Sequence, residues 1–270
     1  VEQVFVGNGS DEILALGTRA IVEDGGTIGY FQPSYSLYPV LAQIRCAVAA
    51  PVALAADFGW RMPAGYTASL FFLTNPNAPT SVLYPRAQVA AFCRALPGVV
   101  LIDEAYVDFA REDCLALAQE LPNVLVMRTL SKSFSLAGLR LGYAVGAAEL
   151  IAALYTIKDS YNVAALAQRL ALAALSDLPH MRQNVERIRA TRARLAQTLA
   201  GLGFAVYPSE TNFLWTRPPR RPAAAWFAQL RERAVLIRHC AGERTADCLR
   251  ITGGTDAEGA RLGAVLRASE

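Results

Sequence analysis

Short apolar runs alternate with segments of helical periodicity through the first part of the chain. The runs occupy residues 4–6, 27–31, 44–50, 69–74, 99–102, 124–128 and 142–145. Several are apolar at nearly every position, as strands buried on both faces of a parallel sheet are. Apolar residues at helical spacing lie between them, for example at 13–21 and 85–95. This alternation predicts right-handed βαβ units, and hence an α/β fold with a large, mostly parallel sheet flanked by helices.

The pattern changes in the second part of the chain. Helical periodicity covers residues 162–176 and 178–201, with a break at Asp177-Leu178-Pro179. Further on, strands are expected at 204–207, 211–216, 234–239 and 248–252, and helices at 222–233 and 255–268. We therefore expect a large domain over residues 1–176 and a small C-terminal α+β domain over residues 177–270. Because the chain enters directly on a strand-like run, we also expect sequence to be missing upstream.

Composition and charge exclude several classes of partner. The 270 residues are 53% hydrophobic and carry a net charge of +3, which supplies a large core but no strongly basic surface. The two basic clusters, at 182–194 and 217–222, are expected to be a solvated helix face and a solvated loop. No apolar stretch reaches the roughly 18 to 20 residues that a membrane span needs. We expect neither nucleic acid nor a membrane as a partner.

Cysteine and histidine usage argues against a metal site. The five cysteines are Cys46, Cys93, Cys114, Cys240 and Cys248, with no C-x-x-C pair among them. Their odd number and wide spacing favour reduced thiols in a cytoplasmic protein over disulfides or zinc. The only histidines are His180 and His239, too few for a histidine-rich metal site. We expect no metal.

The candidate chemistry centres on Lys132, which follows the apolar run 124–128 and has Arg140 eight positions further on. Ligands of open α/β sheets bind at the carboxyl ends of strands, where this lysine is expected. A lysine there can hold a carbonyl compound as a Schiff base, as in enzymes that use pyridoxal phosphate. Ser131, Ser133 and Arg140 suit the phosphate end of such a cofactor. The alternative is a surface loop with an ordinary solvated lysine.

Two further segments could contribute to the same kind of site. The glycine-rich turn at residues 7–12 opens a helix with Ser10 or Asp11 at its cap, which is a natural seat for a phosphate but is also a common structural motif. Tyr35 follows the strand 27–31 and could cover a flat aromatic ligand, or could simply pack in the core.

Charged residues at or within apolar strands also need partners. Asp103 ends the apolar run 99–102, and burying its carboxylate unpaired would cost several kcal/mol. A protonated ring nitrogen would be a suitable partner, and the alternative is that Asp103 caps the next segment. Arg238 and Arg250 lie inside strands among apolar neighbours, where an arginine is costly without an anion to bind.

Taken in order, these motifs resemble the fold-type I pyridoxal-phosphate aminotransferases, and most closely the histidinol-phosphate aminotransferases. The likeness covers nearly all of the chain. It runs through Gly9-Ser10-Asp11-Glu12, Pro33-Ser34-Tyr35, Asn75-Pro76-Asn77-Ala78-Pro79-Thr80, Asp103-Glu104-Ala105-Tyr106, Arg128-Thr129-Leu130-Ser131-Lys132, Gly138-Leu139-Arg140, Ser209-Glu210-Thr211-Asn212-Phe213 and Leu249-Arg250-Ile251-Thr252.

The resemblance implies a role for each candidate. Lys132 would carry the cofactor and then move a proton between it and the substrate carbon. Asp103 would pair with the pyridine nitrogen, Tyr106 would hydrogen-bond the ring oxygen, and Tyr35 would stack on the ring. The phosphate would be held by Ser10, Asp11 (through its backbone N–H), Ser131 and Arg140. Arg250 would bind the α-carboxylate of glutamate, and Arg238 with it the phosphate of histidinol phosphate. The family forms its active site between two subunits, so a homodimer is implied.

The chain departs from the family pattern in the loop at 75–81. The asparagine that usually precedes Pro-Thr-Gly and shares the ring oxygen is Ala78 here, and the glycine is Ser81. Asn77 is the candidate replacement.

The resemblance implies an aminotransferase that converts L-histidinol phosphate with 2-oxoglutarate as acceptor, in histidine biosynthesis. The alternatives are an aromatic or broad-specificity aminotransferase and a lyase of the threonine-phosphate decarboxylase type. A catalytically idle fold that only binds a partner would require Lys132 to be unreactive.

Overall fold

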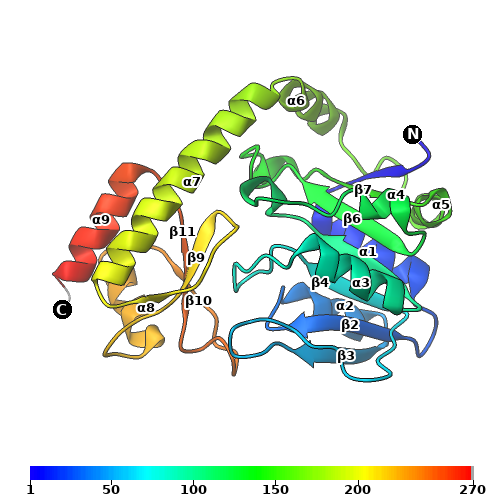
Figure 1. The fold of residues 1–270 in the computed structure, drawn as a ribbon. Coiled ribbons are helices and arrows are strands. Elements are labelled where there is room, and N and C mark those ends of the chain that lie inside the picture. Colours follow the sequence, from blue (N-terminus) through cyan, green and yellow to red (C-terminus); the bar gives the residue numbers. More distant parts are fainter. Residues whose placement is uncertain (269–270) are drawn as a thin grey trace.

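Two β-sheets organise the computed structural model, which describes residues 1–268 (Figure 1). The larger sheet has the order β1-β7-β6-β5-β4-β2-β3. Its strands are β1 (Val4–Gly7), β2 (Thr27–Gln32), β3 (Val48–Ala53), β4 (Leu70–Thr74), β5 (Val99–Asp103), β6 (Val124–Thr129) and β7 (Gly142–Gly146). The five strands from β3 to β6 run parallel, and only β7 is antiparallel to its neighbours β6 and β1. The expected α/β fold with a mostly parallel sheet is confirmed.

Alternation along the buried central strands divides the core of this sheet into two layers. Phe71 and Phe72 of β4 are both fully buried, but they belong to separate clusters on opposite faces. Helices α1 (Ser10–Ile21), α2 (Leu37–Ile44) and α5 (Ala148–Ile157) cover the Phe72 face, and α3 (Arg86–Ala95) and α4 (Leu117–Glu120) cover the other. Both faces are therefore sealed, and the carboxyl ends of the parallel strands are left for a site.

The smaller sheet is antiparallel, with the order β10-β11-β9-β8. Its strands are β8 (Ala205–Val206), β9 (Phe213–Arg217), β10 (Arg238–His239) and β11 (Leu249–Thr252), and its helices are α7 (Leu178–Gly201), α8 (Ala223–Glu232) and α9 (Asp256–Arg267). Figure 1 shows the long α7 leading from α6 (Ala165–Leu175) to this sheet. Asp177 caps α7 by accepting a hydrogen bond from the backbone N–H of His180. The expected domain boundary at residues 176 and 177 falls between α6 and α7 and stays a prediction.

Apolar packing fixes the smaller sheet against the larger one. Trp215 of β9 and the nearby Cys248 are buried in the same core cluster as Phe71. Phe213 of β9 packs edge-on against the ring of Tyr106, with 5.1 Å between ring centroids. The groups that the smaller sheet contributes to a site are therefore held in place by a shared core.

Two expected strands differ from the structure. The expected strand at 44–50 is wrong in its first part, because α2 continues to Ile44 and β3 begins only at Val48. Prolines hide this boundary in the sequence: Pro39 lies within α2 and Pro51 within β3, an edge strand where a missing N–H is tolerated. The expected strand 234–239 shortens to Arg238–His239, because Ala234 adopts a left-handed conformation (φ 54°) just after α8.

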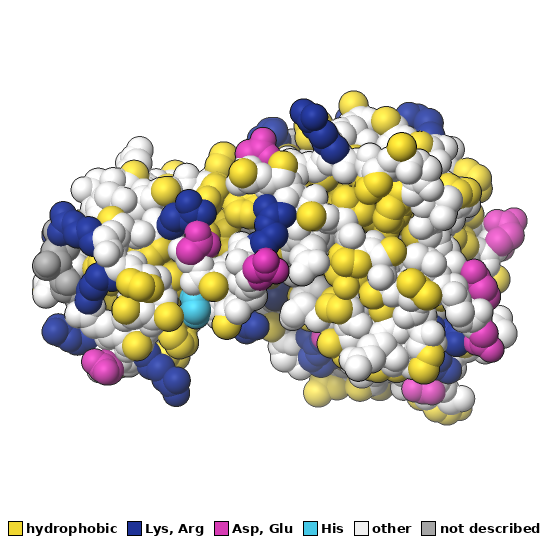
Figure 2. Space-filling model, turned by 90° about the horizontal axis from the view of Figure 1, so that it is seen from below, with side chains coloured by type: hydrophobic (Ala, Val, Ile, Leu, Met, Phe, Trp, Pro, Cys, Tyr) yellow, Lys and Arg dark blue, Asp and Glu magenta, His cyan; other side chains and the backbone are white. Residues whose placement is uncertain are grey.

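The charges on the surface are mixed (Figure 2), and the helices are short or polar. On the face shown in Figure 2, Lys and Arg side chains are spread among acidic and apolar ones and form no single patch. Among residues 1–268, no helix combines the length and apolar character needed to cross a membrane.

Candidate active site

A cavity of about 850 Å³ opens at the carboxyl ends of β2, β4, β5 and β6, beneath the β10–β11 segment of the smaller sheet. Every predicted site residue except Asn77 and Ser133 lines it; Ser133 is buried, and its hydroxyl donates to Asp108. The large-sheet side supplies Ser10, Asp11, Tyr35, Asp103, Tyr106, Ser131, Lys132 and Arg140, and the small-sheet side supplies Arg238 and Arg250. Residues spread over most of the sequence thus face one space.

Asp103 is the last residue of β5 and is 3% exposed. Its Oδ1 accepts a hydrogen bond from the backbone N–H of Ala105 (3.0 Å), and its Oδ2 accepts one from the hydroxyl of Tyr38 (2.9 Å). Burial raises the pKa of Asp103 to about 6, although these two hydrogen bonds act in the opposite direction. Such a buried carboxylate is destabilising until a cation pairs with it.

Lys132 lies in the loop after β6 and is the only lysine lining the cavity. The sequence contains just one other lysine, Lys158, which follows α5 and donates to the backbone carbonyl of Asp159. The Nζ of Lys132 is 5.4 Å from the centroid of the Tyr106 ring. A carbonyl compound that forms a Schiff base in this cavity therefore has one lysine available to it.

A seat for an anion forms where the N-terminus of α1 meets Arg140. Gly9 precedes α1 with φ +81°, and a Cβ at this position would lie 2.6 Å from Nη2 of Arg140, so glycine is needed for the close approach. The Oγ of Ser10 is buried without a hydrogen-bond partner among the described residues. Arg140 has a left-handed backbone (φ 54°) and lies 3.4 Å from a carboxylate oxygen of Asp11. The helix dipole, the guanidinium and the unpaired hydroxyl together suit a phosphate group.

A second anion site forms on the small sheet. Arg238 and Arg250 are directly opposite each other in the antiparallel pair β10–β11. Repulsion between the two positive charges makes this arrangement unfavourable unless an anion lies between or beside them. The guanidinium of Arg250 lies over the ring of Phe213 at 4.9 Å, and its Nε is buried without a partner within the described chain. Phe213 in turn contacts Tyr106, so two rings connect the Arg250 side of the cavity to Lys132.

The structure does not bring Asn77 to the position expected for it. Its side-chain amide donates to the carbonyl of Pro33 (3.0 Å) and to Oγ1 of Thr80 (2.8 Å), and its Oδ1 accepts from Ser34 (2.8 Å). Asn77 is fully buried within its loop, and Ala78 faces the cavity instead. The amide has no donor left for a cofactor oxygen.

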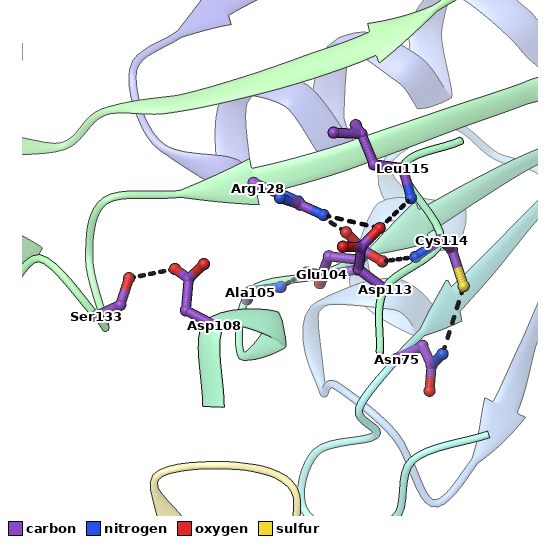
Figure 3. Close-up of polar contacts among 10 residues, drawn as sticks. Asn75, Glu104, Ala105, Asp108, Asp113, Cys114, Leu115, Arg128 and Ser133 are labelled. Atoms are coloured by element: carbon purple, nitrogen blue, oxygen red, sulfur yellow. Dashed lines mark hydrogen bonds and ion pairs between the residues drawn. The ribbon is translucent and has the colours of Figure 1, made fainter. Parts of the chain in front are cut away.

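Polar cross-links hold the segments of Asp103 and Lys132 together (Figure 3). The fully buried side chain of Glu104 accepts from Nε of Arg128 at 2.8 Å, and the hydroxyl of Ser133 donates to a carboxylate oxygen of Asp108. Burial raises the pKa of Glu104 to about 7, and the charge of Arg128 opposes this rise. The first link joins the segment after β5 to β6 itself, and the second joins it to the loop after β6. The cavity edge that carries both candidates is therefore braced.

Sequence reasoning missed Glu104 and Arg128 as a pair, and it missed Tyr38 altogether. The alternation of side chains signals the first, since Glu104 must face away from the cavity if Asp103 faces it. Tyr38 is on α2 and Tyr35 lies just before that helix, three residues earlier, and their rings meet edge-on with 5.7 Å between centroids. This three-residue spacing is the signal that could have linked Tyr38 to the site.

Comparison with known proteins places the chain in a class. It belongs to the aminotransferase class I and II family, whose pattern matches residues 1–265.

The individual proteins that the chain resembles have more specific names than this family. It is 43% identical over 256 residues to a histidinol-phosphate aminotransferase of Citrifermentans bemidjiense, covering 94% of this chain and 73% of that one. It is 44% identical over 272 residues to one of Acetobacter pasteurianus, covering 98% and 76%. Among solved structures, a histidinol-phosphate aminotransferase from Sinorhizobium meliloti in complex with pyridoxal-5'-phosphate superimposes with a TM-score of 0.89 at 27% identity, covering 100% of this chain and 78% of that one. An L-threonine-O-3-phosphate decarboxylase from Porphyromonas gingivalis shares the fold at 22% identity, with a TM-score of 0.88, 99% of this chain and 83% of that one.

Replacing Asp103 tests the cost of its burial. The folded-state pKa of about 6 lies above the ordinary 3.8, so the unfolded chain loses this proton first, and the free energy of unfolding falls as pH rises from about 4 to 6. We expect the cofactor-free Asp103→Asn variant to lack this loss and to be more stable than the native protein at pH 8 by about 3 kcal/mol. Urea unfolding at pH 4 and pH 8 measures the difference. Equal pH dependence in the two proteins would show that folding does not raise the pKa of Asp103.

Proposed function

We propose that the chain is a pyridoxal-phosphate-dependent aminotransferase that acts on L-histidinol phosphate, with 2-oxoglutarate as acceptor, in histidine biosynthesis. The observation that carries the proposal is the arrangement of one cavity, in which the only lining lysine, a buried carboxylate and a phosphate seat face one another. The named relatives at 43% and 44% identity support the choice of reaction and substrate.

The residues fit the cofactor at both of its ends. The N-terminus of α1, Ser10, Ser131 and Arg140 would bind the phosphate, and Asp103 would hold the proton on the ring nitrogen. The bound cofactor supplies an electron-withdrawing ring that stabilises negative charge on the substrate carbon. Lys132 would hold the cofactor through Nζ and would move the proton at the substrate carbon.

Two tyrosines position the ring. Tyr35, oriented by the hydrogen bond from its hydroxyl to Asp11 (3.2 Å), would cover the ring, and Tyr106 would donate to the ring oxygen. Burial is the largest influence on Tyr35 and raises its pKa to about 12, so the phenol stays neutral. Ala78 offers no hydrogen bond, which leaves the ring oxygen to Tyr106.

The paired arginines select an anionic substrate. Arg250 binds the α-carboxylate of glutamate, and Arg238 joins it in binding the phosphate of histidinol phosphate. An aromatic or broad-specificity aminotransferase remains an alternative, because paired arginines do not choose among anions. The threonine-phosphate decarboxylase type is another, since it shares the fold.

The assembly and location form part of the same proposal. We place the enzyme in the cytoplasm as a homodimer, with a large unit over residues 1–176 and a small one over residues 177–270. Exposed leucines on α6, namely Leu166, Leu170, Leu172 and Leu175, supply an apolar surface for a subunit contact.

Removing Lys132 tests cofactor attachment. We expect the purified protein with added pyridoxal phosphate to show an imine absorbance band in the visible, and the Lys132→Ala variant to lack it. Lys158→Ala is the matched control and should keep the band, because this lysine does not line the cavity. A native protein that stays colourless with the cofactor would exclude the proposed function.

Replacing the two arginines separately tests substrate recognition. If both bind the phosphate, Arg238→Ala should lower kcat/KM for histidinol phosphate by about tenfold to a hundredfold and spare glutamate, whereas Arg250→Ala should impair both. Half-reactions with histidinol phosphate, glutamate, phenylalanine and threonine phosphate measure this. Preference for phenylalanine would favour the broad-specificity alternative, and carbon dioxide release from threonine phosphate would identify the lyase.

A further inference from the structure

The hydroxyl of Tyr38 is buried and directed at Asp103. Tyr38 lies on α2, has no exposed surface, and stacks its ring on Phe72 with 4.7 Å between centroids and 16° between planes. Its Oη is 2.9 Å from Oδ2 of Asp103 and 2.5 Å from Oγ1 of Thr74. Ring packing alone explains a phenylalanine at this position but gives no reason for a hydroxyl.

The direction of these hydrogen bonds follows from their chemistry. An ionised carboxylate only accepts, so the single hydroxyl hydrogen of Tyr38 goes to Asp103, and Thr74 can then donate to the oxygen of Tyr38. Thr74 is the last residue of β4 and is paired in register with Asp103 on β5. The Tyr38 hydroxyl on α2 thus contacts Oδ2 of Asp103 on β5, and Thr74 on β4 holds that hydroxyl in place.

We propose that Tyr38 is a positioning residue for the reaction, which holds Asp103 ionised and in the orientation that pairs with the cofactor ring nitrogen. The inference rests on the proposed function, because it is the bound ring that makes the orientation matter. Oδ1 is held by the backbone N–H of Ala105, so the Tyr38 bond to Oδ2 removes the remaining rotational freedom of the carboxylate.

The charged surroundings of Asp103 make this hydrogen bond consequential. The titratable groups facing it are Asp11 from α1, Lys132 from the loop after β6, Tyr106 from the segment after β5, and Tyr35 and Tyr38. Burial raises the pKa of Asp103, the charge of Asp11 adds to the rise, and the bond from Tyr38 is the largest opposing influence. Without that bond, the carboxyl would hold its proton to higher pH and would pair with the ring less well at neutral pH.

The test is Tyr38→Phe, which keeps the ring and removes only the hydroxyl. The matched control is Tyr84→Phe, because Tyr84 is also buried and its hydroxyl donates to the carbonyl of Phe58, on the other face of the sheet. Pyridoxal phosphate affinity is measured from pH 5 to pH 9 by titrating the visible band. We expect Tyr38→Phe to weaken binding at neutral pH by about tenfold, and the pH below which affinity falls to move up by about one unit.

Measuring the titration of Asp103 in the cofactor-free protein separates the effect of Tyr38 on the carboxyl group from any effect on cofactor binding. The infrared band of the protonated Asp103 carboxyl, identified by its absence in Asp103→Asn, should titrate at higher pH in Tyr38→Phe than in the native protein. If Tyr38→Phe fails to fold, Thr74→Val should move both readouts in the same direction by a smaller amount. Failure of the native protein to bind the cofactor would remove the proposed function. The role of Tyr38 alone would be overturned if the native protein binds the cofactor normally and the Tyr38→Phe variant matches Tyr84→Phe in both cofactor affinity and carboxyl titration. Where Tyr38→Phe does not fold, the same comparison is made with Thr74→Val.

Discussion

A single buried carboxylate, at the carboxyl end of β5, is the constraint on which the rest of the site depends. Asp103 is 3% exposed and has a pKa raised by its burial, so the fold carries a destabilising charge at the bottom of a cavity. Neutral partners reduce this cost but do not remove it: Tyr38 and the backbone N–H of Ala105 each supply one hydrogen bond. A cationic ring nitrogen would remove it, which links the stability of the fold to occupation of the site.

The surroundings of Asp103 fix the positions of the other candidate site residues relative to it. The Glu104–Arg128 pair joins the segment after β5 to β6, and the Ser133–Asp108 hydrogen bond joins it to the loop after β6, which keeps Lys132 on the same cavity edge. Phe213 packs against Tyr106 and lies beneath the guanidinium of Arg250, so the small sheet presents its cations to the same space. The backbone, the apolar packing and the ion pair therefore hold the side chains around the cavity in fixed positions, and catalysis requires such preorganisation.

The sequence predicts this site well where an apolar strand ends in a polar residue. The runs that became β4, β5 and β6 are buried almost throughout, and the residues that follow them include Asp103 and Lys132. The boundary between α2 and β3 was mispredicted because proline occurs inside both elements. Tyr38 could not be separated from an ordinary core tyrosine, because its role depends on a hydroxyl contact with residues 36 and 65 positions away. Asn77 was assigned to the cavity from its place in a motif, whereas its amide is used within its own loop.

Reductive trapping tests the central claim most directly, because the sequence contains only Lys132 and Lys158 as lysines. The protein is loaded with pyridoxal phosphate, treated with borohydride, digested and mapped by mass spectrometry. We expect a phosphopyridoxyl group on the peptide that contains Lys132, and less of it after the same treatment of Asp103→Ala, because that variant lacks the carboxylate that pairs with the ring. Modification of Lys158 instead, or of neither lysine, would contradict the central claim.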